Sequence, residues 1–538
     1  MLPHRSLVSR ALKTRASSSL AWIRPGAHDY LRETLESRVY EVAVQTPLAY
    51  APSLSKTLPN GSSLYLKRED LQPTFSFNIR GAHNKIANLT PLQKQNGIVA
   101  CAAGNHVQGV AYSAQHLGID AVIVTPLGTT QNKIAPNNQS RVKIIEHGTD
   151  FEASLKEAYR IAQTEGRSLV HPFDDPLVIA GHGTVGMEIL KDTAGELPDA
   201  IFAPVGGGGL IAGIAAFVKE VAPTVRIIGV EQEGANLLQV SRQKRECVSF
   251  PVVNRFTDDV GIRALGEENY RLCSALVDDV VTVSTDEICS AIKDIFGDTR
   301  SLMEPLGAIS VAGAKKYAHE HAATSQQAEK YVAILAAANM DFDRLRFVAE
   351  RSDDRERFMS VQIPETKGSF QRLYNLIYPR NVTEFTYRMN SQDDDVAHIC
   401  MSIQTKSAPE FDEVITQINS QDGMRATDLS ENELAKAHLR HLTGGRADDV
   451  SHERLFRLEF PERPGALKDF LGTLGDASHA RWNVSLFHYR NHGADIGRVL
   501  VGFQVPAAEN DAFSAFLQKV GFRFVEETKN PAYTQFLM

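Results

Sequence analysis

Residues 200–221, "AIFAPVGGGGLIAGIAAFVKEV", combine three patterns in one short stretch. The first residues form an apolar run typical of a buried parallel strand, and the last twelve have the apolar periodicity of a helix. Four glycines, Gly206 to Gly209, separate them. Backbone N–H groups in such a turn can approach an anion, and the dipole of the following helix favours a phosphate. Tight packing alone is the alternative explanation for the glycines.

The same alternation of strand and helix patterns extends from about residue 30 to residue 347. Strands joined by crossover helices predict an α/β domain whose parallel strands are covered by helices on both faces. Ligands of such domains bind beyond the carboxyl ends of the strands. The other predicted strands are "GIVACAAG", "AVIVTPLG", "VKIIEHG" and "VRIIGVE", and "VQGVAYSAQHLG" is a further predicted helix.

Length and composition indicate an ordinary globular protein with several domains. A chain of 538 residues exceeds what one hydrophobic core usually supports, so two to four domains are expected. With 23% charged residues, a net charge of −8 and no long basic stripe beyond the N-terminus, neither nucleic-acid nor membrane-surface binding is expected. The five scattered cysteines lack CxxC spacing, which favours reduced intracellular thiols over disulfides or a metal site. No apolar run reaches the roughly 20 residues of a membrane span.

The N-terminal segment differs in composition from the rest of the chain. Residues 1–28 contain several arginines and serines, and the first acidic residue is Asp29. This pattern is typical of a mitochondrial transit peptide, with a disordered basic tail as the alternative. The expected location is the mitochondrial matrix, or the cytoplasm if the segment is not a transit peptide.

The C-terminal part contains an internal repeat. "VQIPETKGSFQRLYNLI" and "NVTEFTYR" return as "LEFPERPGALKDFLGTL" and "NVSLFHYR", and Pro461 follows Pro364 by 97 residues (461 − 364 = 97). Two small α+β units are therefore predicted, serving either as a structural duplication or as a regulatory module. The expected domains are 29–350, 356–428 and 452–538, with a linker at 429–451.

A second candidate site motif is "CAAGNHVQGVA", in which Asn105 and His106 follow Gly104 at the end of a predicted strand. The asparagine could bind a ligand hydroxyl or carboxylate. A helix cap is the commoner role for an isolated asparagine.

Together with "SFNIRGAHNK", "HPFDDPLVIAGHGTVGMEIL", "EPLGA" and "DFDRLR", these motifs resemble biosynthetic threonine ammonia-lyase, also called threonine deaminase. The resemblance runs from about Asp29 to the C-terminus. It implies a tryptophan-synthase-β-like fold of two parallel α/β subdomains, pyridoxal phosphate as cofactor, and two ACT-like regulatory units. The family converts threonine to 2-oxobutyrate and ammonia for isoleucine synthesis, with isoleucine as feedback inhibitor.

The resemblance also implies roles for individual positions. The cofactor positions are Phe77, Asn105, Gly206, Gly207, Gly208, Gly209 and Ala336; the substrate positions are Ala102, Gly104 and His106; the effector positions are Glu462, Tyr489, Asn491 and His492.

Asn78 is the most consequential departure from the family pattern. The family motif Ser-Phe-Lys-x-Arg-Gly-Ala supplies the lysine that forms the Schiff base, and an amide neither forms an imine nor acts as a base. Four further departures fall at pocket positions. Ala336 replaces the serine that bonds the pyridine nitrogen, Ala102 replaces a carboxylate-binding serine, Asp259 replaces a glycine beside the cofactor, and Leu306 replaces a serine.

Lys85 is a poor substitute for the missing lysine. It lies seven residues after Asn78, which on a helix is about two turns or roughly 10 Å. The family pattern is kept at Gly206 to Gly209, Asn105, Phe77 and Arg80. We therefore expect that the fold is retained while the requirement for catalytic activity is relaxed.

Three hypotheses remain open. The first is a catalytically impaired pseudoenzyme that keeps amino-acid sensing and associates with itself or with an active paralogue. The second is an active threonine or serine deaminase with altered chemistry, and the third is a sensing module whose α/β half is a scaffold. The expected ligands are a threonine-like amino acid and isoleucine or valine as effectors.

Overall fold

The structure, a computed structural model, consists of two compact units, Met1–Ser352 and Asp353–Met538. Each unit is described separately below. The described residues are 28–102, 104–127, 129, 141–193, 195–253, 256–257, 261–322, 326–352, 355–364, 369–380, 382–387, 396–439, 451–461, 482, 484–490 and 496–537.

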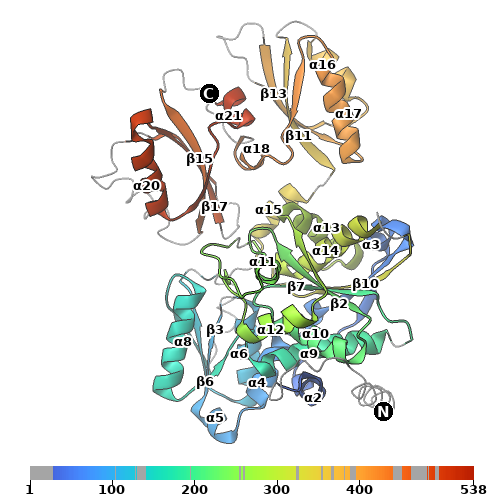
Figure 1. Cartoon of the computed structure of the whole chain (residues 1–538), viewed down its shortest axis with the longest axis vertical. Helices are drawn as coiled ribbons and strands as arrows, with labels where there is room; N and C mark the ends of the chain where they lie inside the picture. Colours follow the sequence, from blue (N-terminus) through green and yellow to red (C-terminus); the bar gives the residue numbers. More distant parts are fainter. Residues whose placement is uncertain are drawn as a thin grey trace. The chain divides into compact units, whose positions relative to one another are not determined.

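A six-stranded sheet forms the centre of the first unit (Figure 1). Its order is β1-β2-β10-β7-β8-β9; all neighbours are parallel except β1 and β2. Such strands are buried on both faces, which explains their nearly continuous apolar sequences. The strands are β1 (Leu48–Tyr50), β2 (Ser63–Arg68), β7 (Ala200–Pro204), β8 (Arg226–Gln232), β9 (Asp279–Val283) and β10 (Lys330–Leu335).

Helices cover both faces of this sheet and create two apolar cores (Figure 1). One core contains residues of α9 (Pro176–Asp192), α10 (Gly209–Val221) and α12 (Glu267–Leu276). The other contains residues of α13 (Thr285–Thr299) and α14 (Pro305–Ala322). The predicted α/β class is therefore confirmed.

A second sheet has four parallel strands in the order β5-β4-β3-β6. The core on one face contains residues of α4 (Asn78–Ala87) and α6 (Asn105–Leu117), and the core on the other contains residues of α8 (Phe151–Glu165). The two parallel subdomains implied by the family resemblance are thus present. The strands are β3 (Ile98–Cys101), β4 (Ala121–Thr125), β5 (Val142–Glu146) and β6 (Ser168–Val170).

The remaining helices of this unit are shorter. They are α2 (Tyr30–Leu35), α3 (Pro52–Thr57), α5 (Pro91–Asn96), α11 (Leu237–Lys244) and α15 (Arg344–Arg351), with short 3₁₀ turns at Val39–Glu41, Pro59–Gly61 and Glu69–Leu71.

The second unit contains two antiparallel four-stranded sheets of the same design, ordered β12-β13-β11-β14 and β16-β17-β15-β18. The first strands of the repeats, Glu356–Pro364 and Glu453–Pro461, start and end 97 residues apart (453 − 356 = 461 − 364 = 97). Both sheets also have a register shift at the equivalent edge strand. The predicted pair of α+β units is confirmed.

The elements of this unit are β11 (Glu356–Pro364), α16 (Ser369–Ile377), β12 (Val382–Tyr387), β13 (Val396–Gln404), α17 (Ala408–Asn419), β14 (Arg425–Asp428), α18 (Glu433–Ala437), β15 (Glu453–Pro461), β16 (Val484–Arg490), β17 (Ile496–Gln504), a 3₁₀ turn (Ala507–Glu509), α20 (Asn510–Val520), β18 (Arg523–Glu526) and α21 (Pro531–Phe536).

The two repeats pack against each other through equivalent residues. Phe358 of β11 and Leu455 of β15 belong to one shared apolar cluster. Asn432 and Asn530, which cap α18 and α21, donate to each other's side-chain oxygens at 2.9 and 3.2 Å. The stretch expected to be a linker contains helix α18. This helix is held in place because its fully buried Leu434 belongs to the shared cluster.

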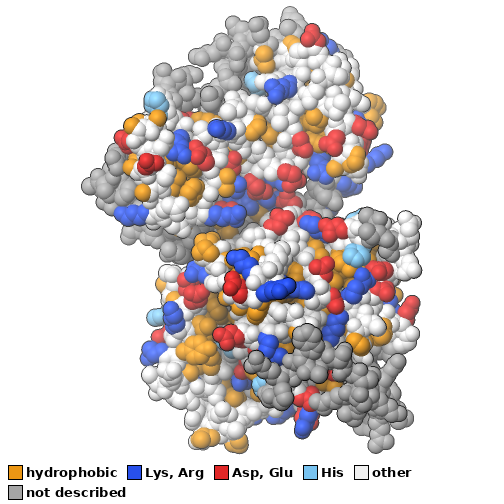
Figure 2. Space-filling model, in the orientation of Figure 1, with side chains coloured by type: hydrophobic (Ala, Val, Ile, Leu, Met, Phe, Trp, Pro, Cys, Tyr) orange, Lys and Arg blue, Asp and Glu red, His pale blue; other side chains and the backbone are white. Residues whose placement is uncertain are grey.

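The surface drawn in Figure 2 has acidic and basic side chains interspersed over both units. Among the described residues, no helix combines the length and apolar character needed to cross a bilayer.

Candidate functional site

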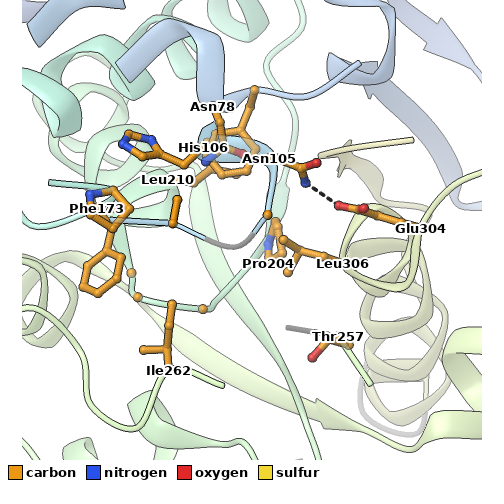
Figure 3. Close-up of a pocket in the computed structure, with 18 of the residues that line it drawn as sticks. Asn78, Asn105, His106, Phe173, Pro204, Leu210, Thr257, Ile262, Glu304 and Leu306 are labelled. Atoms are coloured by element: carbon orange, nitrogen blue, oxygen red, sulfur yellow. Dashed lines mark hydrogen bonds between the residues drawn. The ribbon is translucent and has the colours of Figure 1, made fainter. Parts of the chain in front are cut away.

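A cavity in the first unit lies where several strands end and several helices begin (Figure 3). Its wall includes residues that follow β3, β6 and β7, as expected for an α/β sheet. Five lining residues are each the first residue of a helix: Asn78 of α4, Asn105 of α6, Gly209 of α10, Pro305 of α14 and Arg344 of α15. Because the N-terminal end of a helix carries partial positive charge, this convergence favours an anionic ligand.

The glycine turn at the start of α10 is shaped both by packing and by backbone conformation. A Cβ atom at Gly207 would lie 2.3 Å from Cγ of Phe173, and Gly208 has a φ of +91°. A Cβ atom at Gly206 would meet nothing closer than 3.9 Å, so this side of the turn is open. Packing therefore explains part of the glycine run, while the N–H groups at the helix start remain suited to a phosphate.

Asn105 is held by two side chains. Its Nδ2 donates to Glu304 Oε1 at 2.5 Å (Figure 3). Its Oδ1 accepts from Asn339 Nδ2 at 2.8 Å. An amide nitrogen carries two hydrogens, so one donor is left for a ligand. Gly104 is the cap residue of α6, and the side chain of Asn105 does not perform the capping role that we considered. Glu304 is the one acidic residue among the lining residues that the structure describes.

Asn78 lines the cavity from the first position of α4. Ile79, Arg80 and Gly81 continue this helix. None of the cavity-lining residues described is a lysine. Lys85 lies in the last turn of the same helix, as expected, and its Nζ pairs with Asp175 Oδ2 at 2.6 Å.

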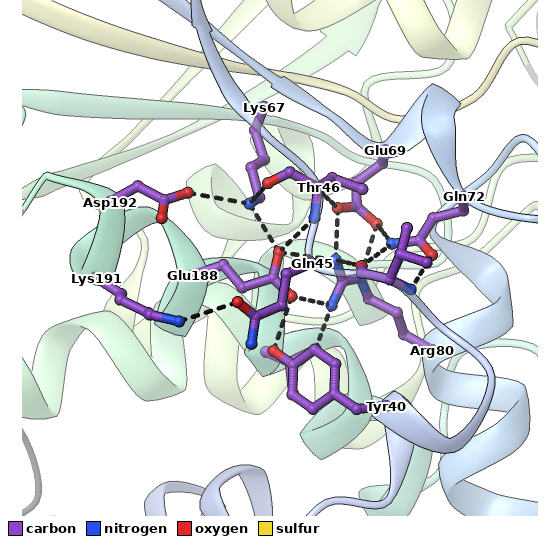
Figure 4. A network of polar contacts seen from close by, with 12 residues as sticks. Tyr40, Gln45, Thr46, Lys67, Glu69, Gln72, Arg80, Glu188, Lys191 and Asp192 are labelled. Carbon is purple, nitrogen blue, oxygen red and sulfur yellow. Dashed lines mark hydrogen bonds and ion pairs between the residues drawn. The ribbon is translucent and has the colours of Figure 1, made fainter. Parts of the chain in front are cut away.

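The start of α4 is anchored by a buried ionic network (Figure 4). Arg80, which is fully buried, pairs with Glu69 and Glu188 at 2.7 Å each. Lys67 Nζ contacts Glu188 at 2.7 Å and the backbone oxygen of Thr46 at 2.6 Å. Burial alone would lower the pKa of Arg80, but the two carboxylates outweigh it and raise that pKa. Both carboxylates are thus satisfied, and the helix that carries Asn78 is fixed.

His106 is the second residue of α6 and is buried in the cavity wall. Its Nε2 lies 3.4 Å from the backbone oxygen of Val170. Burial lowers the pKa of His106 to about 4, so the imidazole is neutral near pH 7.

The structure brings most of the predicted site residues together. Phe77, Ala102, Gly104, Gly206 to Gly209 and Leu306 line the cavity with Asn78, Asn105 and His106. Ala336 does not line it; this residue is fully buried, and its carbonyl accepts from the N–H of Phe77 at 3.1 Å. Lining residues to which the sequence analysis gave no individual role include Thr257, which lies outside the quoted motifs, and four residues within them: Phe173, His182, Glu304 and Arg344.

Four predicted positions lie outside the described residues: Asp259, Glu462, Asn491 and His492. Tyr489 belongs to β16, but the structure describes only its backbone. These assignments remain predictions.

Comparison with known proteins identifies the chain's relatives. Residues 39–336 match the family described as pyridoxal-phosphate dependent enzyme, and residues 348–439 and 444–537 match the C-terminal regulatory domain of threonine dehydratase. The mitochondrial threonine dehydratase of Schizosaccharomyces pombe is 48% identical over 516 residues, covering 95% of this chain and 84% of that protein. The corresponding protein of Saccharomyces cerevisiae is 47% identical over 522 residues, covering 95% and 89%.

A solved structure supports the same relationship. The processed form of threonine deaminase isoform 2 from Solanum lycopersicum has a TM-score of 0.57 and 40% identity, covering 60% of this chain and 87% of that chain. The chain therefore belongs to the threonine dehydratase family, whose cofactor is pyridoxal phosphate and whose catalytic fold is followed by a threonine-dehydratase regulatory domain.

Proposed function

We propose that this protein is a pseudoenzyme of the threonine dehydratase family that retains the cofactor cavity and the regulatory unit. The observation that carries the proposal is the amide of Asn78 on the cavity wall, combined with the absence of lysine among the lining residues described. The family's catalytic lysine both attaches the cofactor and transfers a proton. Losing positioned proton transfer alone would lower the rate by about 10²–10⁴-fold.

The cavity fits pyridoxal phosphate at its phosphate end. The N–H groups that begin α10 can receive the phosphate, since the side of Gly206 is open. The second amide hydrogen of Asn105 can bond the ring hydroxyl. When bound in a competent enzyme, pyridoxal phosphate supplies an electron sink for the substrate carbanion. Here we expect non-covalent binding, because the lining residues that the structure describes offer no amine for the aldehyde.

Two nearby lysines are engaged elsewhere. Lys85 Nζ is paired with Asp175 Oδ2 at 2.6 Å, and the other oxygen of this carboxylate caps helix α9. Lys67 is fully buried between Glu188 and the backbone of Thr46. Withdrawing Lys85 would break its pair with Asp175, and withdrawing Lys67 would remove one of the two cations that contact Glu188.

We further propose that the C-terminal unit binds a branched-chain amino acid, isoleucine or valine, near Glu462, Tyr489, Asn491 and His492. The match to the threonine dehydratase regulatory domain supports this role. A mitochondrial location is supported by the names of both yeast relatives and by the arginine- and serine-rich residues 1–28. We propose self-association or association with an active paralogue, which would use symmetric, self-complementary surfaces.

The test is turnover of L-threonine and L-serine by homogeneous protein with added pyridoxal phosphate, measured beside the Asn78→Lys variant. The proposal predicts turnover at the level of a protein-free control for the natural sequence. Release of 2-oxobutyrate from threonine by the natural sequence, in proportion to the protein concentration, would instead establish a deaminase with altered chemistry. Copurification with a lysine-bearing threonine dehydratase would favour a paralogue-associated role over a pure sensing module.

A further inference from the structure

His182 is a buried histidine in the cavity wall for which the family assignment gives no role. It lies in the middle of α9, is only 1% exposed, and lines the cavity together with Asn78 and His106. Its Nδ1 has no hydrogen-bond partner among the described residues. A buried polar atom without a partner destabilises the protein, so a hydrogen bond to this atom would be favourable.

Packing against α4 fixes the orientation of the His182 ring. The ring meets Phe77 edge-on, with 4.9 Å between centroids and an interplanar angle of 67°. A Cβ atom at Gly81 would lie 2.5 Å from Cε1 and 2.7 Å from Nε2 of His182, so only glycine allows this approach. Gly81 follows Asn78 by three residues and therefore shares its helix face. His182 thus contacts the same end of α4 as Asn78.

The charge state of His182 limits what it can recognise. Burial, with smaller effects from His106 and Arg80, lowers the pKa of His182 to about 3, and the ring is neutral near pH 7. A neutral imidazole offers one N–H donor and one lone pair. It is suited to an uncharged polar group, such as a carbonyl oxygen, more than to forming an ion pair.

We propose that His182 is a ligand-binding residue and that, together with the amide of Asn78, it hydrogen-bonds the aldehyde oxygen of non-covalently bound pyridoxal phosphate. This inference rests on the proposed function, because only a cavity without the lysine leaves the aldehyde as a free carbonyl. His106 also lines the cavity and also has an unpartnered Nδ1, but its Nε2 lies 3.4 Å from the backbone oxygen of Val170. The lysine would thus be replaced by neutral donors that hold the aldehyde without reacting with it.

The test compares the affinities of the full-length protein for pyridoxal phosphate and for inorganic phosphate in the variants His182→Leu and His182→Gln. We expect His182→Leu to weaken pyridoxal phosphate binding about 3- to 10-fold, the size of one hydrogen bond, with phosphate affinity unchanged. His182→Gln keeps a donor and should stay within about twofold of the natural protein. Raman spectroscopy should show the carbonyl stretch of the bound aldehyde at higher wavenumber in His182→Leu.

His83 provides a matched control. It is also buried and has an unpartnered Nδ1, but it does not line the cavity. His83→Leu should leave both affinities and the carbonyl stretch unchanged. Equal pyridoxal phosphate affinity and an unshifted stretch in folded His182→Leu would overturn the inference while leaving the proposed function standing.

A measurement on the natural sequence removes dependence on the folding of the variants. Saturating pyridoxal phosphate should shift the ring ¹⁵N resonances of His182 in labelled protein, and unchanged resonances would refute the contact. Failure of the natural protein to bind either pyridoxal phosphate or phosphate would refute the retained cofactor cavity, and the inference with it.

Discussion

Replacing Arg80 with methionine tests whether the buried network holds the start of α4. The change removes contacts of 2.7 Å to both Glu69 and Glu188. Glu188 would keep Lys67 at 2.7 Å, whereas Glu69 would keep only uncharged donors. Breaking a buried ion pair by removing one partner typically costs 3–5 kcal/mol. Since one carboxylate stays compensated, we expect a loss of about 3 kcal/mol in the free energy of unfolding.

Urea unfolding followed by far-UV circular dichroism measures this loss. In a Trp22→Phe background, fluorescence of buried Trp482 follows the second unit separately and should be unchanged by Arg80→Met. Arg160→Met, which removes an exposed pair with Glu157, should leave both transitions unchanged. Adding Glu69→Gln to Arg80→Met should recover part of the loss, because the uncompensated charge disappears. A loss below about 1 kcal/mol for Arg80→Met would refute the reasoning.

Further predictions concern the cavity and the regulatory unit. Gly207→Ala would place a methyl group 2.3 Å from the Phe173 ring, so it should destabilise the protein by about 1–3 kcal/mol in thermal unfolding and weaken phosphate binding; an unchanged stability would contradict the packing. Saturating isoleucine or valine should raise the melting temperature, since a hundredfold excess over Kd stabilises by about 2.7 kcal/mol; coinciding melting curves in both amino acids and in buffer would contradict the sensing role. Asn78→Lys should restore a borohydride-reducible adduct with pyridoxal phosphate but little threonine turnover. The effects of residues that act together in catalysis are not additive, so restoring one of them recovers little of the rate. Useful turnover is expected only when that change is combined with Ala102→Ser, Asp259→Gly and Ala336→Ser, and a fully active single variant would show that the rest of the pocket is intact.

The sequence predicted those parts of the fold that depend on local patterns. The run from Ala200 to Val221 forms strand β7, the glycine turn and helix α10, because apolar periodicity and glycine freedom act over neighbouring residues. The repeat offset of 97 residues likewise located β11 and β15 as equivalent strands of the two repeats. The small helix α18 was missed because burial of Leu434 depends on contacts with the other repeat.

The candidate site was predicted less completely, since its contacts join distant parts of the chain. His182 is 104 residues after Asn78 (182 − 78 = 104), and although it lies within the quoted motif "HPFDDPLVIAGHGTVGMEIL", no local pattern places it beside Asn78. The partners of Arg80 lie 11 and 108 residues away, and no local pattern indicates them. Ala336 does not line the cavity, but its carbonyl accepts from the N–H of Phe77, which does, and its role at the cofactor stays a prediction.

The most direct test of the central claim is to incubate the natural full-length protein with pyridoxal phosphate, reduce it with borohydride, and map pyridoxyl groups by mass spectrometry. Asn78→Lys, treated in parallel, provides the positive control for labelling at the cavity. We predict that the natural protein carries no stoichiometric pyridoxyl-lysine and that its threonine turnover equals the protein-free control. A single lysine labelled stoichiometrically in the natural protein, together with threonine turnover abolished by its replacement, would contradict the account.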